Sequence, residues 1–228
     1  MNECLDIVEK LLKDSALYMN LIKINAHETR ACIELGDTGE IATLVLGDKV
    51  EVLEGSVKPD FKISMKKQVL KKILEGKADA FALAGRGGAD EVRPIEFEIH
   101  NKERSEELWE TIRALLTYFF IPGKVKVKNL SSEQAGLAHG AHPIPLVYWN
   151  GIRYSWILVK HGEVLNKDKE RDPWPQTFII LEGKGKAVVG KEEFDIKPNT
   201  AIYIPRNTVH QIIAEEDVKL VWLAWQAW

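Results

Sequence analysis

The sequence is poor in cysteine and contains no long apolar run. Only two of its 228 residues are cysteines, Cys4 and Cys32, and so few argue for reduced core residues and against a disulfide scaffold. No stretch approaches the roughly 20 apolar residues that a membrane-spanning helix needs. The acidic N-terminal stretch also lacks the apolar run of a secretory signal. We therefore expect a soluble, cytoplasmic protein without a transmembrane segment.

The chain also lacks an excess of charge of one sign. Its 31 basic and 34 acidic side chains leave a formal net charge of −3, without the basic field that nucleic-acid-binding proteins use. The Gly-Arg-Gly-Gly stretch at 85–88 does not have the spacing of a phosphate-binding motif, so we interpret it as a loop. We see no nucleophile–base pair. The composition therefore excludes nucleic acid as a partner. The length of the chain, 228 residues, suits two domains.

Residues 1–122 switch between helical and strand periodicity. Apolar spacing predicts a helix at 2–19, two shorter helices at 66–75 and 78–84, and a long amphipathic helix that ends before Pro122. Alternating segments at 30–35, 41–46, 49–54 and 61–65 are separated by Gly, Asp and Pro turns, which predicts an antiparallel meander. A further strand is expected at 95–99. This half is therefore predicted to be an α+β domain.

Residues 60–87 (DFKISMKKQVLKKILEGKADAFALAGRG) resemble the sterol carrier protein 2 family. In that family an alternating strand is followed by a helix, a Gly-Lys pair, a short helix and another strand. The resemblance implies a five-stranded sheet covered by helices, with an apolar tunnel for acyl chains or other lipids. The candidate ligand-binding wall is Val69, Ile73, Phe81, Leu83, Trp109, Ile112, Leu116 and Phe120. A solid hydrophobic core is the alternative for the same residues.

Past Pro122 the pattern becomes that of short strands. Residues 124–128 alternate as a charged edge strand, and 129–145 have no clean period and are predicted to be a connecting loop. Strands are expected at 146–149, 154–160, 177–181, 186–189, 201–204 and 218–224. Such spacing is typical of an all-β sandwich or barrel.

Two stretches of this half resemble the motifs of the cupin family. Between Gly162 and Gly183, Asp168 and Glu170 stand where the first motif has two histidines, and Gln176 stands where it has glutamate. Counting back from Gly183 places Arg171 or Asp172 at the second of these positions instead. In the second motif His210 is retained, while Asn199 and Asn207 replace glycines. Asparagine is one of the few residues that tolerate the left-handed backbone conformation.

The resemblance to cupins implies a jelly-roll barrel, also called a double-stranded β-helix, with a degenerate metal site. Its four positions are Asp168, Glu170, Gln176 and His210. Because transition metals prefer imidazole ligands, we expect no cofactor and at most weak binding of a divalent metal. Trp174, beside this site, is a further candidate for ligand binding. Tryptophan suits subunit interfaces equally well, so the barrel is also a candidate for homodimerisation.

These observations predict a sterol-carrier-like lipid-binding domain at 1–122, followed by a cupin β-barrel at 123–228. The expected function is non-catalytic binding or carrying of a small apolar or amphipathic molecule. The barrel would be a second pocket or a dimerisation module. One alternative is a metal-dependent isomerase, decarboxylase or dioxygenase that uses His210 with Gln176 and either Glu170 or Asp168. Another is a ligand sensor that acts on a protein partner.

Overall fold

The computed structural model describes residues 2–85, 92–149 and 151–226. Most of the Gly-Arg-Gly-Gly stretch at 85–88 lies outside these residues. Contacts within the chain define two compact units. The first holds residues up to 84 together with 92–129, and the second holds residue 85 and the chain from 130 onward. None of the helices that the structure describes is long and apolar enough to cross a membrane.

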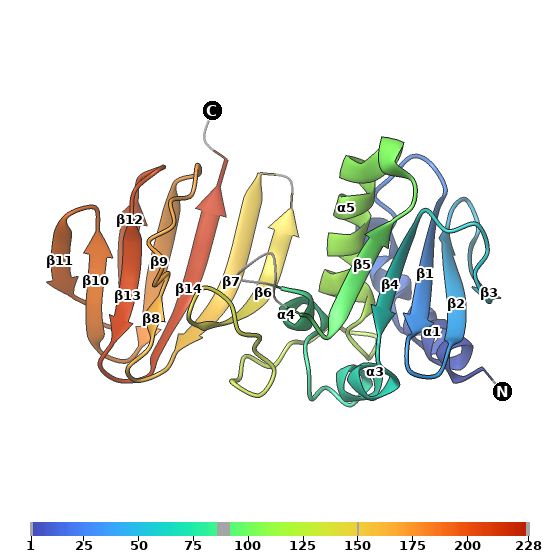
Figure 1. Ribbon diagram of the computed structural model, residues 1–228, viewed down its shortest axis with the longest axis horizontal. Helices are drawn as coiled ribbons and strands as arrows, with labels where there is room; N and C mark the ends of the chain where they lie inside the picture. The colour runs from blue at the N-terminus through green and yellow to red at the C-terminus, as the bar shows by residue number, and fades with distance from the viewer. Residues whose placement is uncertain (1, 86–91, 150, 227–228) are drawn as a thin grey trace. The chain divides into compact units, whose positions relative to one another are not determined.

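The first unit combines helices with one sheet (Figure 1). Its helical elements are α1 (Glu3–Asp14), η1 (Ala16–Tyr18), α2 (Met19–Ile22), α3 (Lys67–Leu74), α4 (Ala80–Ala84), η2 (Lys102–Arg104), α5 (Ser105–Ala114) and the π-helical η3 (Leu115–Phe119). Its strands are β1 (Thr29–Leu35), β2 (Glu40–Leu46), β3 (Val50–Glu54), β4 (Phe61–Met65) and β5 (Ile95–Ile99). The other predicted helices and strands of this half are present with shifts of a few residues at their ends, but the helix predicted at 2–19 ends at Asp14 and is followed by η1 and α2. The long predicted helix is α5 continued by η3.

The sheet of the first unit is mixed and has the order β3-β2-β1-β4-β5. The predicted meander is correct for β1 to β3 and wrong for β4, which pairs with β1 in parallel. Residues 55–60 make this crossover along one face of the sheet. The hydroxyl of Thr43 holds them there, since it donates to Gly55 O (2.7 Å) and accepts from Val57 N (3.0 Å). Turn residues at both ends of the crossover gave it the sequence pattern of a hairpin.

The core of the first unit lies between the sheet and the helices. One face of the sheet presents apolar side chains that are fully buried: Ala31, Ile33, Leu44, Phe61 and Ile63. Helix α1 packs against β1, β2 and β3, and α4 packs against β5. The two cysteines are free and buried, as predicted. Burial raises the pKa of the Cys4 thiol to about 12.

Residues 124–128 are not a strand, which corrects the sequence prediction. They belong to the first unit. Lys126 and Lys128 are held there by individual contacts and not by the hydrogen-bond ladder of a strand. The backbone N–H of Lys126 donates to the Tyr18 hydroxyl (3.1 Å), and Lys128 forms an ion pair with the buried Asp79 (2.7 Å). Val125 and Val127 point to solvent.

The second unit is built from strands alone, within the residues that the structure describes. They are β6 (His142–Trp149), β7 (Ile152–Val159), β8 (Val164–Leu165), β9 (Gln176–Glu182), β10 (Gly185–Val189), β11 (Glu192–Asp195), β12 (Thr200–Ile204), β13 (His210–Ala214) and β14 (Val218–Trp225). The sequence missed β8, β11 and β13. It also began β6 too late, since 142–145 were predicted to be loop. Pro143 and Pro145 interrupt the strand pattern there, but β6 is an edge strand, where proline is tolerated.

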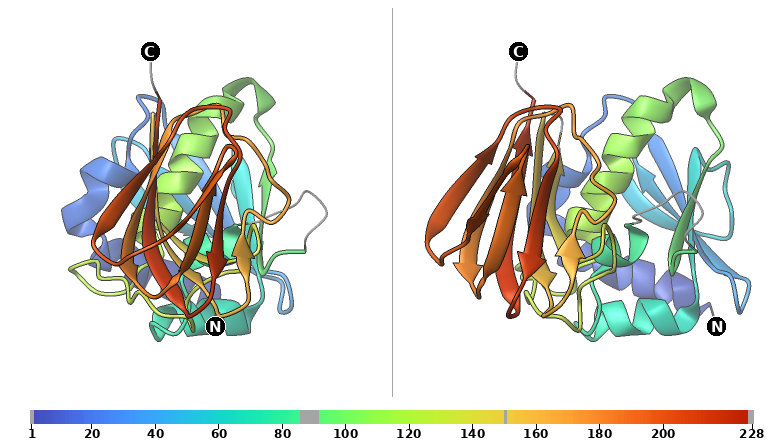
Figure 2. Two further views of the ribbon diagram at one scale, coloured as in Figure 1. Left: turned by 90° about the vertical axis from the view of Figure 1, so that its left-hand side faces the viewer. Right: turned by 60° about the vertical axis from the view of Figure 1, so that its left-hand side comes forward.

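These strands form two sheets, β11-β10-β13-β8 and β12-β9-β14-β7-β6, shown from two further sides in Figure 2. This is the sandwich alternative, because the described strands are not joined into one closed barrel. Residues from both sheets meet in a single apolar core: Ala141, Ile157, Val159, Leu165, Phe178, Ile180, Ala187, Ile196, Ile202, Ile204, Ile212, Ala214, Val218 and Leu220. Asn199 and Asn207, which replace the motif glycines, have φ values of +61° and +57°. Both are therefore in the left-handed region that the sequence allowed.

Candidate ligand-binding site

Polar side chains gather at one end of the inner face of the sheet β12-β9-β14-β7-β6 in the second unit. Phe178 and Ile180 of β9 belong to the core, and the two-residue repeat of a strand puts Gln176 on the same face. By the same repeat, Arg153 of β7 shares the face of Ile157. The strand register places the following residues side by side across the sheet: Tyr148, Arg153, Ala224, Gln176 and Ile204. We call this set the inner row.

The middle of the inner row holds its smallest side chain. Ala224 lies on β14 between Arg153 of β7 and Gln176 of β9. Neighbouring strands are about 5 Å apart, so these two polar residues stand about 10 Å from each other across a methyl group. The next position inward on β14 is the half-buried Trp222, which pairs with Phe178. The Tyr148 ring lies 6.1 Å from the Trp222 ring. Arg153 and Gln176 thus lie on either side of Ala224, and the aromatic rings of Trp222 and Tyr148 lie next to them.

The amide of Gln176 is oriented by Trp222. The indole N–H of Trp222 donates to Oε1 of Gln176 over 2.7 Å. An indole N–H can only donate, so this contact fixes which end of the amide is oxygen. Gln176 is 2% exposed, and its NH2 group has no hydrogen bond among the described residues. That group is the end of the amide that remains available to a ligand.

His210 faces the same interior from the opposite sheet. It begins β13 and is 8% exposed, with its ring 5.7 Å from that of Phe178. Nδ1 lies 2.9 Å from the carbonyl oxygen of Thr208. A carbonyl only accepts, so Nδ1 carries a proton. In the neutral imidazole, Nε2 then keeps a lone pair and presents an acceptor.

Arg153 is the charged member of the inner row. Its guanidinium carbon lies over the Trp174 ring, 4.3 Å from the ring centroid. Trp174 is held by the turn before β9, where its backbone N–H donates to Oδ1 of Asp172 (2.8 Å). Within the part of the chain that the structure describes, Arg153 has no acidic partner and no hydrogen-bond acceptor. Its side-chain N–H groups are therefore unused by the described residues.

The loop between β8 and β9 is tied to β13 by a buried asparagine. Asn166, which is 6% exposed, donates from Nδ2 to the carbonyl oxygens of Glu170 (2.9 Å) and His210 (2.8 Å). The backbone carbonyl oxygen of Asn166 accepts from Nε2 of Gln211 (3.1 Å). These bonds fix the start of the segment that carries Trp174 relative to His210.

The four degenerate cupin positions do not converge on one point. Gln176 and His210 lie inside, while Asp168 and Glu170 are exposed. The Glu170 carboxylate lies 3.1 Å from Nδ1 of His139. Oε1 of Gln176 is the only side-chain oxygen with which this residue could bind a metal, and it accepts a hydrogen bond from the indole of Trp222. Among the described residues no three His, Cys, Asp or Glu side chains are grouped to hold a metal. One imidazole nitrogen and one occupied amide do not fit the metal of a cupin enzyme.

The predicted lipid-binding wall of the first unit lies mostly in its core. Ile73, Ile112, Leu116 and Phe120 are at most 2% exposed and Phe81 is 9% exposed. Val69 and Leu83 are half-buried. Trp109 differs from the others, because it is 37% exposed and meets Phe97 edge to face at 5.8 Å. It does not share the buried face of α5 with Ile112, contrary to the grouping made from helical spacing.

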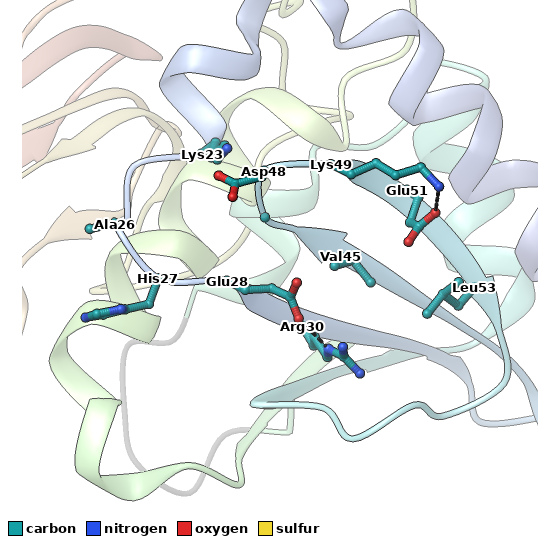
Figure 3. Close-up of a pocket in the computed structure, with 11 residues that line it drawn as sticks. Lys23, Ala26, His27, Glu28, Arg30, Val45, Asp48, Lys49, Glu51 and Leu53 are labelled. Carbon is teal, nitrogen blue, oxygen red and sulfur yellow. Dashed lines mark hydrogen bonds and ion pairs between the residues drawn. The ribbon is translucent and has the colours of Figure 1, made fainter.

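A hollow of about 230 Å³ opens on the first unit beside β1, β2 and β3 (Figure 3). Val45 and Leu53 contribute its apolar part. Its charged side chains include two neighbouring pairs, Arg30 with Glu28 (2.8 Å) and Lys49 with Glu51. Within each of these two pairs the charges offset each other.

Sequence reasoning found Trp174, Gln176 and His210 but missed Arg153 and Tyr148 as members of the site. The strand β7 was predicted to begin at 154, which left Arg153 in a turn. In the structure β7 begins at Ile152. The available signal was the alternation of positions 153, 155, 157 and 159, which puts an arginine on the same face as two core residues.

Residues 156–225 match the cupin domain family, which supports the resemblance of the second unit to cupins. The match includes Trp174, Gln176, His210 and Trp222, and it begins after Tyr148 and Arg153. It does not extend to the first unit. No curated protein matches this chain.

Solved cupin structures resemble the chain only in part. One is a Cupin 2 conserved barrel domain protein from Salinispora arenicola, with 16% identity and a TM-score of 0.40 over 45% of this chain and 90% of that chain. A cupin-2 domain protein from Rhodospirillum rubrum has 22% identity and a TM-score of 0.35, over 39% and 62%. A predicted oxalate decarboxylase from Thermotoga maritima has 14% identity and a TM-score of 0.36, over 38% and 81%.

Proposed function

We propose that the protein binds a small amphipathic molecule in its cupin unit, at the inner row, without transforming it chemically. The observation that carries the proposal is a set of polar groups that face the interior of the second unit from both of its sheets and have no hydrogen-bond partner among the described residues. These groups are the guanidinium of Arg153, the NH2 of Gln176 and Nε2 of His210. A few directed polar groups among aromatic side chains are the usual composition of a small-molecule site.

The groups that are present favour binding over metal-dependent catalysis. The inner row holds no carboxylate, and His210 is the one imidazole that faces it among the described residues. The inner row also lacks the ligand set that a metal-dependent isomerase, decarboxylase or dioxygenase requires. We therefore prefer a binding role to the enzyme alternative. The same pocket would serve a ligand sensor.

We place the ligand in the second unit and not in a lipid tunnel of the first. The residues proposed for the tunnel are packed as a core, with Ile73, Ile112 and Phe120 each 1% exposed. An acyl chain would have to displace them. Homodimerisation through the cupin unit stays a prediction, for which the exposed outer-face side chains Ile179, Leu181 and Tyr203 are the positions to test.

The proposal is tested by calorimetric titration of the full chain with octanoate, phenylacetate, indole-3-acetate and the neutral amide of each. We expect saturable binding of at least one probe. Trp174→Ala should weaken it by about fivefold to tenfold, because one aromatic contact contributes about 1 kcal/mol. Tyr203→Ala is the matched control, since it removes an aromatic ring that is 73% exposed on the outer face. Failure of all six probes, or equal weakening by both variants, would contradict the proposal.

A further inference from the structure

We propose that the ligand of the inner row is a carboxylate carried on an aromatic or other apolar body, and that Arg153 selects it. This inference rests on the binding function proposed above and names the chemical class of the ligand. Tyr148 and Arg153 precede the residues that match the cupin family. The selectivity is therefore attributed to this chain's own residues and not to the family's motif positions.

Arg153 has donors in place and nothing in the described protein to receive them. A guanidinium carries five N–H donors and no acceptor. Arg153 is half-buried on the inner face, and among the described residues its guanidinium lies against the Trp174 ring. Partly buried donors need a partner, which must then be water or a ligand.

The contact with Trp174 favours a carboxylate in particular. An arginine that lies on an aromatic face is held in orientation, and its N–H groups point outward in the plane of the guanidinium. Two of them match the two oxygens of a carboxylate. A flexible lysine would supply charge without this fork.

The surroundings of Arg153 suit an anion with an apolar body. No acidic side chain belongs to the inner row, and Asp168 and Glu170 are exposed on the preceding loop. The half-buried Asp172 accepts from the backbone N–H of Trp174 and forms no ion pair with Arg153.

Beside Arg153, the short side chain of Ala224 is fully buried. The half-buried rings of Trp222 and Tyr148 provide aromatic surface next to these two residues. The NH2 of Gln176, on the far side of Ala224, is a second donor for an oxygen of the ligand.

The test compares each carboxylate with its own neutral amide on the full chain, using phenylacetate with phenylacetamide and indole-3-acetate with indole-3-acetamide. The wild type should bind the carboxylates at least about tenfold more tightly, since a charge-assisted bidentate pair is strong. Arg153→Gln should abolish the preference while the amide affinities stay within about twofold of wild type. Unchanged amide binding also shows that the variant is folded. Arg153→Lys should retain part of the preference.

Arg206→Gln is the matched control, because Arg206 is an exposed arginine of the same unit. It should keep the full preference for carboxylates. The inference is overturned if Arg153→Gln keeps the preference, or if Arg206→Gln loses it equally, which would mean general electrostatic attraction. If the wild type binds acids and amides equally well, only the ligand class is wrong. If it binds neither, the proposed binding function itself fails.

Discussion

The indole N–H of Trp222 donates to Oε1 of Gln176 over 2.7 Å, across the neighbouring strands β14 and β9. This bond decides which chemistry the inner row offers. Gln176 stands where the cupin motif has glutamate, and the oxygen that would bind a metal accepts a hydrogen bond instead. The NH2 group has no hydrogen bond among the described residues. A position used for metal binding in the family is thus suited to donate to a ligand oxygen.

The Trp222–Gln176 bond should be visible as coupling between two substitutions. Trp222→Phe leaves Oε1 of a buried amide without a donor, which should lower the free energy of unfolding by about 1–3 kcal/mol. In Trp222→Phe/Gln176→Leu both polar partners are gone, so the loss should be at least about 0.5 kcal/mol smaller than the sum of the single losses. Urea unfolding of the four proteins measures this. Strictly additive losses would show that the bond does not form.

The metal content of the protein should be far below one per chain. Asp168 and Glu170 are exposed, and Glu170 is paired with His139. The inner residues Gln176 and His210 supply too few ligands for a transition metal. Elemental analysis of protein purified without chelators checks the expectation. Stoichiometric iron, manganese, zinc or nickel that is lost in His210→Ala but kept in Asp168→Asn would restore the enzyme alternative.

Asn207 should be replaceable by glycine but not by alanine. Its φ of +57° is in the left-handed region, and its side chain is exposed. Asn207→Gly should therefore change the free energy of unfolding by less than about 0.5 kcal/mol. Asn207→Ala should lower it by about 1 kcal/mol, because a Cβ without a local hydrogen bond disfavours this conformation. Thermal unfolding of both variants provides the comparison, and equal stabilities would argue against the left-handed backbone.

The stability of the first unit should fall at alkaline pH because of Cys4. Burial raises the pKa of this thiol from 9.0 to about 12. The unfolded chain therefore loses this proton at lower pH than the folded chain. The resulting stabilisation is complete below pH 9 and is lost as the pH rises toward 12.

Cys4→Ala removes the ionisable group and isolates this effect from other titrations. The stability advantage of the wild type over Cys4→Ala should shrink by about 2 kcal/mol between pH 8 and pH 10.5. Urea unfolding at the two pH values gives the difference. A constant gap between the two proteins would mean that the thiol ionises as readily in the folded state as in the unfolded state.

Local patterns predicted most strands and helices, but not how distant segments pair. The alternation of β1 to β4 was readable, whereas the parallel pairing of β1 with β4 depends on a crossover held by Thr43. The prolines of β6 concealed a strand because the sequence does not show which strand is at an edge. The lysines at 126 and 128 looked like strand residues, but they bind Ile121 O and Asp79.

The site was predictable only where a motif marked it. His210 and Gln176 were found through the spacing of cupin motifs, and Trp174 through its place beside them. Arg153 belongs to no motif, and its role depends on the register of β7 with β14, which brings it level with Ala224. Helical spacing grouped Trp109 with Ile112, although the two face different surroundings. Helical periodicity predicts which residues share a face of the helix, but it does not show which part of that face is covered by a neighbouring strand.

The most direct test of the account follows the indole N–H signals of the ¹⁵N-labelled full chain by NMR, assigned through Trp→Phe variants, during titration with indole-3-acetate. The signals of Trp222 and Trp109 report on the two units separately. Trp222 is bonded to Gln176 in the second unit, and Trp109 lies against Phe97 in the first. We predict a saturable shift of the Trp222 signal, with the Trp109 signal unmoved. A shift confined to Trp109, or no shift of Trp222 at saturating probe, would contradict ligand binding at the inner row.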